Sequence, residues 1–158
     1  MTMNDKIIAL HKHWVTADAI KQFMLKTAPI AEPVARLPKA EFQDLAQMQS
    51  QTLRMCTFYA LIYVVIEGYR DLEKSHAVLD ILLAKTDYVD ALRRFRNAVF
   101  HFQEDPLSAK LLEFLNKKDR ELWIEQIYEA FQDLFEEELP VKETLQHLEH
   151  YGTRADGT

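Results

Sequence analysis

The stretch LRRFRNAVFHFQ, residues 92–103, contains the pattern that decides the fold class of this chain. Apolar residues recur there at intervals of three and four, which places them on one face of an α-helix. From just before the stretch to its end, the apolar positions of this face are Tyr88, Leu92, Phe95, Val99 and Phe102. Before the final Gln103, the polar residues of the stretch are Arg93, Arg94, Arg96, Asn97 and His101. We therefore expect a helix with a core face and a polar face, on which Asn97 and His101 are i,i+4 neighbours. Arg96 lies at the border, from which its long side chain can reach either face.

The composition favours a single all-α domain built from long helices. The chain has 158 residues, enough for one core, and only three of them are glycine. Few glycines leave few positions for hairpin turns with positive φ. The single cysteine, Cys56, cannot form an intramolecular disulfide, which is typical of a reduced, cytoplasmic protein. We predict an up-and-down bundle of four or more helices over residues 1–150 and a flexible tail over residues 151–158.

The spacing of apolar residues predicts the order of the helices. They are expected over residues 5–26, 40–73, 76–84, from about residue 87 to the Asp105–Pro106 pair, and 119–139. A connector with three prolines separates the first two, and Gly68 marks a possible bend in the second. Ser75 is the expected N-cap of the third helix, and Thr86 or Asp87 that of the fourth. The Asp105–Pro106 pair is expected to end the fourth helix and to start another, with Asp105 as its cap.

Hydropathy and charge exclude several classes of protein. The longest apolar run, residues 55–66, would rise only about 18 Å as a helix, too short for a bilayer core of about 30 Å. We expect it to be buried on two sides, and a second subunit is one way to cover it. Residues 1–103 hold 13 Lys+Arg and 11 Asp+Glu, whereas residues 104–150 hold 5 and 13. This chain is therefore no general polyanion binder of the histone type. Its acidic last third is expected to be a solvated helix face or, alternatively, a contact for a basic partner.

The polar residues of the opening stretch have two interpretations. A helix needs a polar face, Asp90 can pair with Arg93 or Arg94, and a histidine suits a helix C-terminus. Alternatively, an arginine can clamp a phosphate, and a histidine can transfer a proton near neutral pH. These groups suit metal-free RNA cleavage, in which His101 assists attack by a 2′-hydroxyl and Arg96 stabilises charge on the phosphoryl oxygens. The products would be a 2′,3′-cyclic phosphate and a 5′-hydroxyl. No Cys/His cluster of zinc spacing is visible, and we expect no metal or cofactor.

The segment RNAVFH, residues 96–101, resembles the Arg-polar-x-x-x-His motif of the HEPN superfamily of all-α nucleotide-binding domains. The resemblance implies a catalytic pair of Arg96 and His101, with Asn97 as its polar companion. Many members are metal-independent ribonucleases, often toxins paired with an antitoxin or antiphage proteins, whose site forms across a homodimer. Other members are catalytically silent binding modules. A third hypothesis is an unrelated helical interaction protein.

Three further residues are candidates for contacts with the substrate. The segment YVVIEGYRDL, residues 63–72, resembles the acidic helix that precedes the motif helix in many HEPN proteins, and it contains Glu67. Glu67 could equally form a surface ion pair with Arg70, three residues further on. Arg93 and Arg94 could bind the RNA backbone or remain solvated. RNA and an antitoxin-like protein are thus the implied partners, and no membrane association is expected.

Overall fold

The computed structural model describes residues 3–27, 39–72 and 74–139. Six α-helices follow one another in these ranges: α1 (Met3–Phe23), α2 (Lys39–Arg70), α3 (Ala77–Leu83), α4 (Thr86–Phe100), α5 (Ala109–Leu115) and α6 (Arg120–Glu138). No strand occurs in the described ranges, so the prediction of an all-α bundle is confirmed. The proline-rich connector and the predicted tail over residues 151–158 lie outside the described residues.

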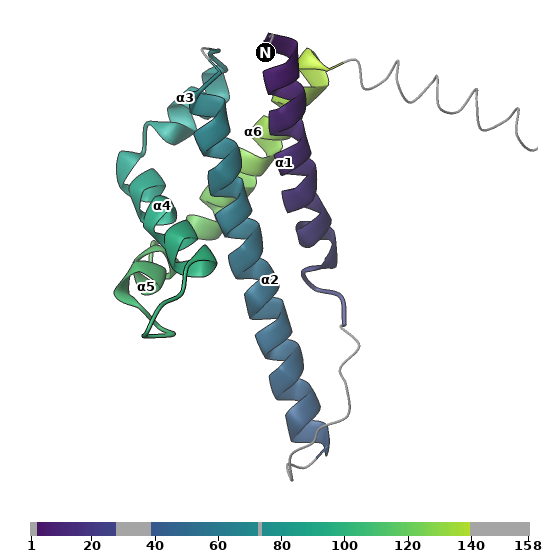
Figure 1. The fold of residues 1–158 in the computed structure, drawn as a ribbon, viewed down its shortest axis with the longest axis vertical. Coiled ribbons are helices and arrows are strands. Elements are labelled where there is room, and N and C mark those ends of the chain that lie inside the picture. The colour runs from purple at the N-terminus through teal and green to yellow at the C-terminus, as the bar shows by residue number, and fades with distance from the viewer. Residues whose placement is uncertain (1–2, 28–38, 73, 140–158) are drawn as a thin grey trace, which may run out of the picture.

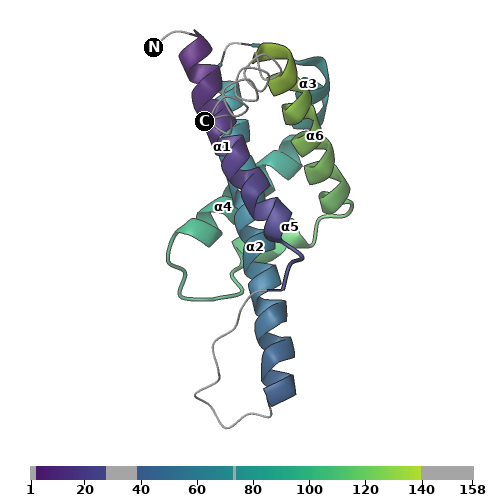
Figure 2. The same cartoon turned by 90° about the vertical axis from the view of Figure 1, so that its right-hand side faces the viewer.

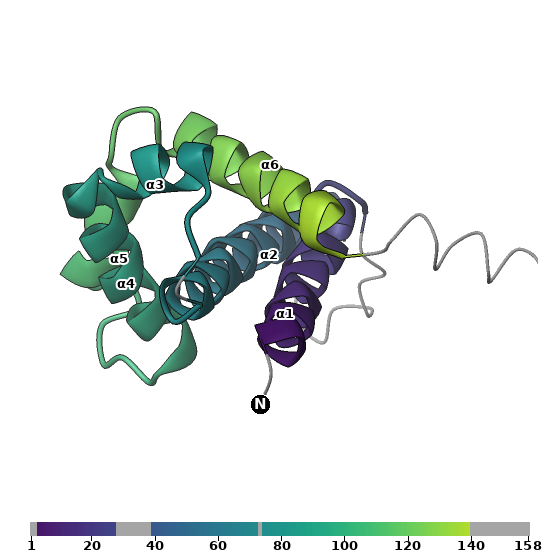
Figure 3. The ribbon, with the colours of Figure 1, turned by 90° about the horizontal axis from the view of Figure 1, so that it is seen from above.

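The long helix α2 organises the bundle (Figure 1). Helix α1 packs antiparallel along it, and α4 and α6 contact it from other sides. Helix α5 packs on α4, and α3 packs on α6, as the view from above shows (Figure 3). The N-terminal half of α2 projects beyond the other helices (Figure 2). At the level where α1 ends, Arg54 of α2 donates to the carbonyls of Phe23 and Lys26, at 2.5 and 2.7 Å. These bonds tie the C-terminal end of α1 and the turn that follows it to α2.

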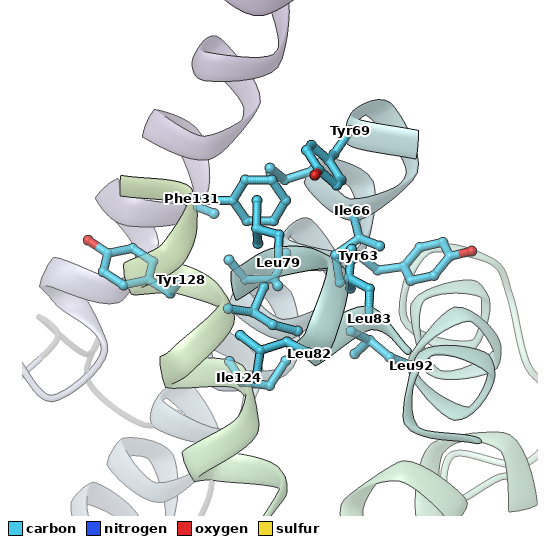
Figure 4. Close-up of a cluster of buried hydrophobic side chains, with 14 of the residues drawn as sticks. Tyr63, Ile66, Tyr69, Leu79, Leu82, Leu83, Leu92, Ile124, Tyr128 and Phe131 are labelled. Carbon is cyan, nitrogen blue, oxygen red and sulfur yellow. The ribbon is translucent and has the colours of Figure 1, made fainter. Parts of the chain in front are cut away.

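The apolar run of residues 55–66 lies in the middle of the core. Phe58, Ile62, Val65 and Ile66 are all buried, and α1, α4 and α6 of the same chain cover the run. The expected burial is therefore confirmed, but one chain supplies the cover and the run gives no reason for a second subunit. Figure 4 shows Ile66 in one cluster of buried side chains with residues from three other helices, among them Leu79 from α3, Leu92 from α4 and Phe131 from α6. No helix in the described ranges has the length and apolarity to cross a bilayer.

Gly68 marks a close approach between α1 and α2. The helix α2 continues through this glycine to Arg70, and a Cβ atom added at Gly68 would lie 2.7 Å from Cδ1 of Leu10 on α1. Leu10 is itself buried. The missing side chain is therefore what lets the two helices pack closely here.

The N-caps of α3 and α4 differ from the predictions. His76 caps α3, because its Nδ1 accepts from the backbone N–H of Leu79, whereas the hydroxyl of Ser75 donates to Asp80. Thr86 and Asp87 lie inside the first turn of α4, so neither is its N-cap. The N-cap position belongs to the preceding lysine, which makes no side-chain capping bond. Asp87 instead accepts a hydrogen bond from Lys117, which fixes the start of α4 to the segment after α5.

The fourth helix ends earlier than the pattern predicted. It stops at Phe100, and His101 has the extended backbone angles φ −118° and ψ 147°. The backbone N–H of His101 still donates to the carbonyl of Asn97, at 3.1 Å. Phe102 was expected on the core face but is 90% exposed, because the chain has left the helical path before reaching it.

The Asp105–Pro106 pair does not start the next helix, contrary to the prediction. Helix α5 begins at Ala109, with Ser108 as its N-cap. Asp105 instead accepts from the backbone N–H of Leu107, at 2.9 Å, which is a local turn rather than a helix cap. The last helix, α6, follows the predicted bounds to within a residue at each end.

Candidate functional site

Arg96 is turned toward α2. Its Nη2 atom lies 2.9 Å from each carboxylate oxygen of Glu67, and its guanidinium carbon lies 5.2 Å from the centroid of the Tyr63 ring. The side chain of Arg96 is 21% exposed, and that of Glu67 is 52% exposed. The structure thus joins two predicted site residues from different helices, and Glu67 contacts Arg96 rather than its other candidate partner, Arg70. This contact is electrostatic and includes a cation–π component with the ring.

The contact with Glu67 leaves part of the Arg96 guanidinium unused. Only Nη2 reaches the carboxylate, whereas Nε is buried and has no hydrogen-bond partner among the described residues. Beside it, burial and then the charge of Glu67 raise the pKa of Tyr63. A guanidinium with free donors, a carboxylate and a phenol therefore meet at the α2–α4 contact.

His101 lies at the exposed end of the same helix. Its side chain makes no hydrogen bond or ion pair with a described residue. Asn97 is half-buried and follows Arg96 directly. The prediction that Asn97 and His101 are neighbours on a continuous helical face is only partly right, since His101 is the C-cap and its backbone has become extended. The structure keeps the two residues close through the backbone bond from His101 to Asn97.

Arg94 ties α4 to α5. Its Nε and Nη2 atoms donate to the two carboxylate oxygens of Glu113, at 2.8 and 2.5 Å. These hydrogen bonds raise the pKa of Arg94 and lower the pKa of Glu113. A bidentate pair of this kind fixes the geometry of both side chains. Arg94 therefore contributes to the packing of α5, and an RNA phosphate would have to compete with Glu113 for it.

Arg93 is the most open of the three arginines. Its Nε lies 3.6 Å from Asp90, one turn earlier on α4, and its side chain is half exposed. The sequence allowed Asp90 to pair with Arg93 or with Arg94, and in the structure the ion pair is with Arg93. A pair this exposed contributes little to stability, so Arg93 is free to contact a ligand at small cost.

Apolar side chains before and after His101 in the chain are exposed, and the sequence pattern did not predict this. Phe100 and Phe102 precede and follow the histidine, and Leu107 is exposed in the loop before α5. The helical periodicity was extended too far and assigned Phe102 to the core. The signal that could have corrected this is the cluster of polar and turn residues that begins at Gln103.

The described residues contain no group of three or more His, Cys, Asp or Glu side chains placed to hold a metal ion. The candidate site is therefore best described by its arginine, asparagine, histidine and glutamate side chains. A comparison with models of protein families, with curated proteins and with solved structures finds no match for this chain. The resemblance to HEPN proteins consequently stays a prediction from the motif.

Proposed function

We propose that this protein is a metal-independent endoribonuclease of the HEPN type, acting in the cytoplasm as a toxin or in antiphage defence. The observation that carries the proposal is the combination at the end of α4. The imidazole of His101 is exposed and has no partner among the described residues, and Arg96 is held at the α2–α4 contact by Glu67. A base that is free to move and a cation that is held in place are what attack on a phosphodiester requires.

In the proposed reaction, His101 takes the proton from the 2′-hydroxyl as its oxygen attacks the adjacent phosphorus. The bond from phosphorus to the 5′-oxygen breaks, and the leaving oxygen takes up a proton. Arg96 stabilises the charge on the phosphoryl oxygens, and Asn97 orients the imidazole or a ribose hydroxyl. One chain offers one such histidine. A homodimer would place a second His101 where it can protonate the leaving group, which is the reason to propose a dimeric enzyme.

Glu67 has a defined part in this proposal. It keeps the Arg96 side chain extended toward α2 before the substrate binds, and the phosphate then competes with its carboxylate for Nη2. The donors on Nη1, which the carboxylate does not use, give the phosphate its first contacts. Arg93, which is half exposed, would contact the RNA backbone nearby.

Cleavage of total RNA in the presence of EDTA tests the proposal. Wild type, His101→Ala and Arg96→Lys are compared, with His13→Ala as the matched control, because His13 is an exposed histidine on α1, outside the candidate site. Loss of the base should slow cleavage by about 10²–10⁴-fold, whereas the control should cleave like wild type. Wild type should leave 2′,3′-cyclic phosphate ends. Equal cleavage by wild type and His101→Ala would refute the catalytic assignment.

A second candidate function is a catalytically silent HEPN-like module that binds a nucleotide or a protein such as an antitoxin. The observation that favours it is the contact between Arg96 and both oxygens of Glu67. This carboxylate already neutralises part of the positive charge that would otherwise bind a phosphate. No cleavage by a folded wild type, together with RNA binding that Glu67→Gln strengthens, would support this candidate. No cleavage and no RNA binding by either protein would exclude the ribonuclease and an RNA-binding module, and would leave a module that binds a protein or the unrelated interaction protein.

A further inference from the structure

A groove between α1 and α6 lies outside the candidate site at the end of α4. Its volume is about 290 Å³, and both helices line it. The helices run antiparallel along it, because the Tyr128 hydroxyl contacts Asp18 at 2.5 Å while the Phe135 ring contacts the His11 ring at a centroid distance of 5.0 Å. Higher numbers on α1 therefore face lower numbers on α6, and the groove has two distinct ends.

Each end of the groove has a carboxylate from a different helix. Asp18 lies at the Tyr128 end, and Glu136, eight residues after Tyr128, is about 12 Å further along α6. Each carboxylate accepts from a glutamine on its own helix, Asp18 from Gln22 at 3.1 Å and Glu136 from Gln132 at 3.0 Å. Neither carboxylate forms an ion pair with a described residue. The groove thus carries two negative charges that are separated along its length.

The floor between the two carboxylates is aromatic, and no lysine or arginine is among the residues that line the groove. Trp14 lies there between the rings of His11 and Tyr128, with centroid distances of 6.0 and 5.2 Å. Burial lowers the pKa of His11, so its imidazole is uncharged at neutral pH. The Lys21 ammonium lies 3.5 Å from the centroid of the Tyr128 ring, but it is paired with Glu125, one turn before Tyr128 on α6, at 2.7 Å, and Lys21 does not line the groove. A ligand on this floor would meet apolar rings in the middle and carboxylates at the ends.

We propose that the α1–α6 groove binds a linear aliphatic polyamine. One terminal ammonium pairs with Asp18, the other pairs with Glu136, and the methylene chain lies on Trp14. The separation of the carboxylates selects for a long, flexible cation with an ammonium group at each end over a compact one, because a single inorganic ion can neutralise only one end at a time. The aromatic floor adds contact area that a metal ion or a buffer cation cannot use. This proposal is independent of the ribonuclease proposal and rests on different residues.

Calorimetric titration of the full chain with spermidine, at fixed ionic strength, tests the proposal. We expect saturable binding of one spermidine per chain, and weaker binding of putrescine, which is too short to reach both carboxylates. Asp18→Asn and Glu136→Gln should each weaken spermidine binding about five-fold, the contribution of one exposed ion pair. The matched control is Glu137→Gln, which removes a charge from the same turn of α6 but does not line the groove. It should bind spermidine like wild type.

The indole N–H signals in an NMR titration locate the bound ligand. The signal of Trp14 should shift, and that of Trp123, which is buried in the core, should not. Asp18→Asn retains an acceptor for the Tyr128 hydroxyl, and its fold is checked by circular dichroism. Glu136→Gln changes only an exposed side chain, so its spermidine affinity tests the proposal even if Asp18→Asn does not fold. Equal weakening by Glu137→Gln, an equal response to Mg²⁺ at the same ionic strength, or no saturable binding would each overturn the proposal.

Discussion

Phe114 is the side chain on which the position of α5 depends. Helix α5 has seven residues, and Phe114 is its single buried residue, with no exposed surface. Its ring packs against the rings of Phe95, Tyr59 and Trp123, at centroid distances of 5.3, 5.9 and 6.4 Å. A helix this short is not stable by itself, so it needs this contact to stay folded.

Phe114→Ala should therefore destabilise the protein strongly. Replacing a buried phenylalanine by alanine costs about 3–5 kcal/mol, because the transfer free energy is lost and a cavity remains. In a domain of this size, each kcal/mol lowers Tm by about 2–4 °C, so we expect a decrease of about 6–20 °C. Urea denaturation followed by far-UV circular dichroism gives the free energy of unfolding.

The control for Phe114→Ala is Leu112→Ala on the same helix. Leu112 is 38% exposed, and its truncation should cost less than about 1 kcal/mol. Hydrogen exchange distinguishes a local loss of α5 from a global loss of stability, because only the amides of α5 lose protection in the first case. A cost for Phe114→Ala below about 1 kcal/mol, or no larger than that for Leu112→Ala, would refute the packing argument.

Three further predictions concern titratable groups. The hydrogen bond from the Ser75 hydroxyl is the main cause that lowers the pKa of Asp80 in the folded protein. The ionised Asp80 carboxylate therefore stabilises the fold above the unfolded pKa of about 3.9, and this stabilisation is lost as the pH falls through the folded pKa. Asp80→Asn should thus be less stable than wild type at neutral pH, and urea denaturation at acid pH should show the difference closing; a constant difference would contradict this. Arg94 likewise lowers the pKa of Glu113, and a double-mutant cycle on this pair should give a coupling that weakens with salt and with acid. A coupling that salt leaves unchanged would argue against an exposed ion pair. Burial raises the pKa of Cys56, so a thiol reagent should modify it slowly in the folded protein and rapidly in urea, and equal rates would show that the site is open.

The sequence was sufficient for the fold class and for most of the core. The spacing of apolar residues reports directly which side chains share a helix face, and α6 shows it best, since Trp123, Ile127 and Phe131 are all buried as their spacing indicates. The central run of residues 55–66 was also predicted to be buried. The helix ends were predicted less well, because an end depends on competition among several local hydrogen bonds. Asp105, for example, closes a turn and does not cap α5.

The partners of each side chain were decided only by the tertiary structure. The sequence placed Arg96 at the border between two faces of its helix, and the packing of α4 on α2 brought it to Glu67, twenty-nine residues away. The packing of α5 on α4 likewise brought Arg94 to Glu113. The side chain of His101 is left exposed at the end of α4. Helical periodicity is a local property of the chain, so it identifies the core face of a helix. Pairing between charged side chains depends on which helices are in contact and on which residues of the two helices lie opposite each other. Both follow from the packing of the whole core.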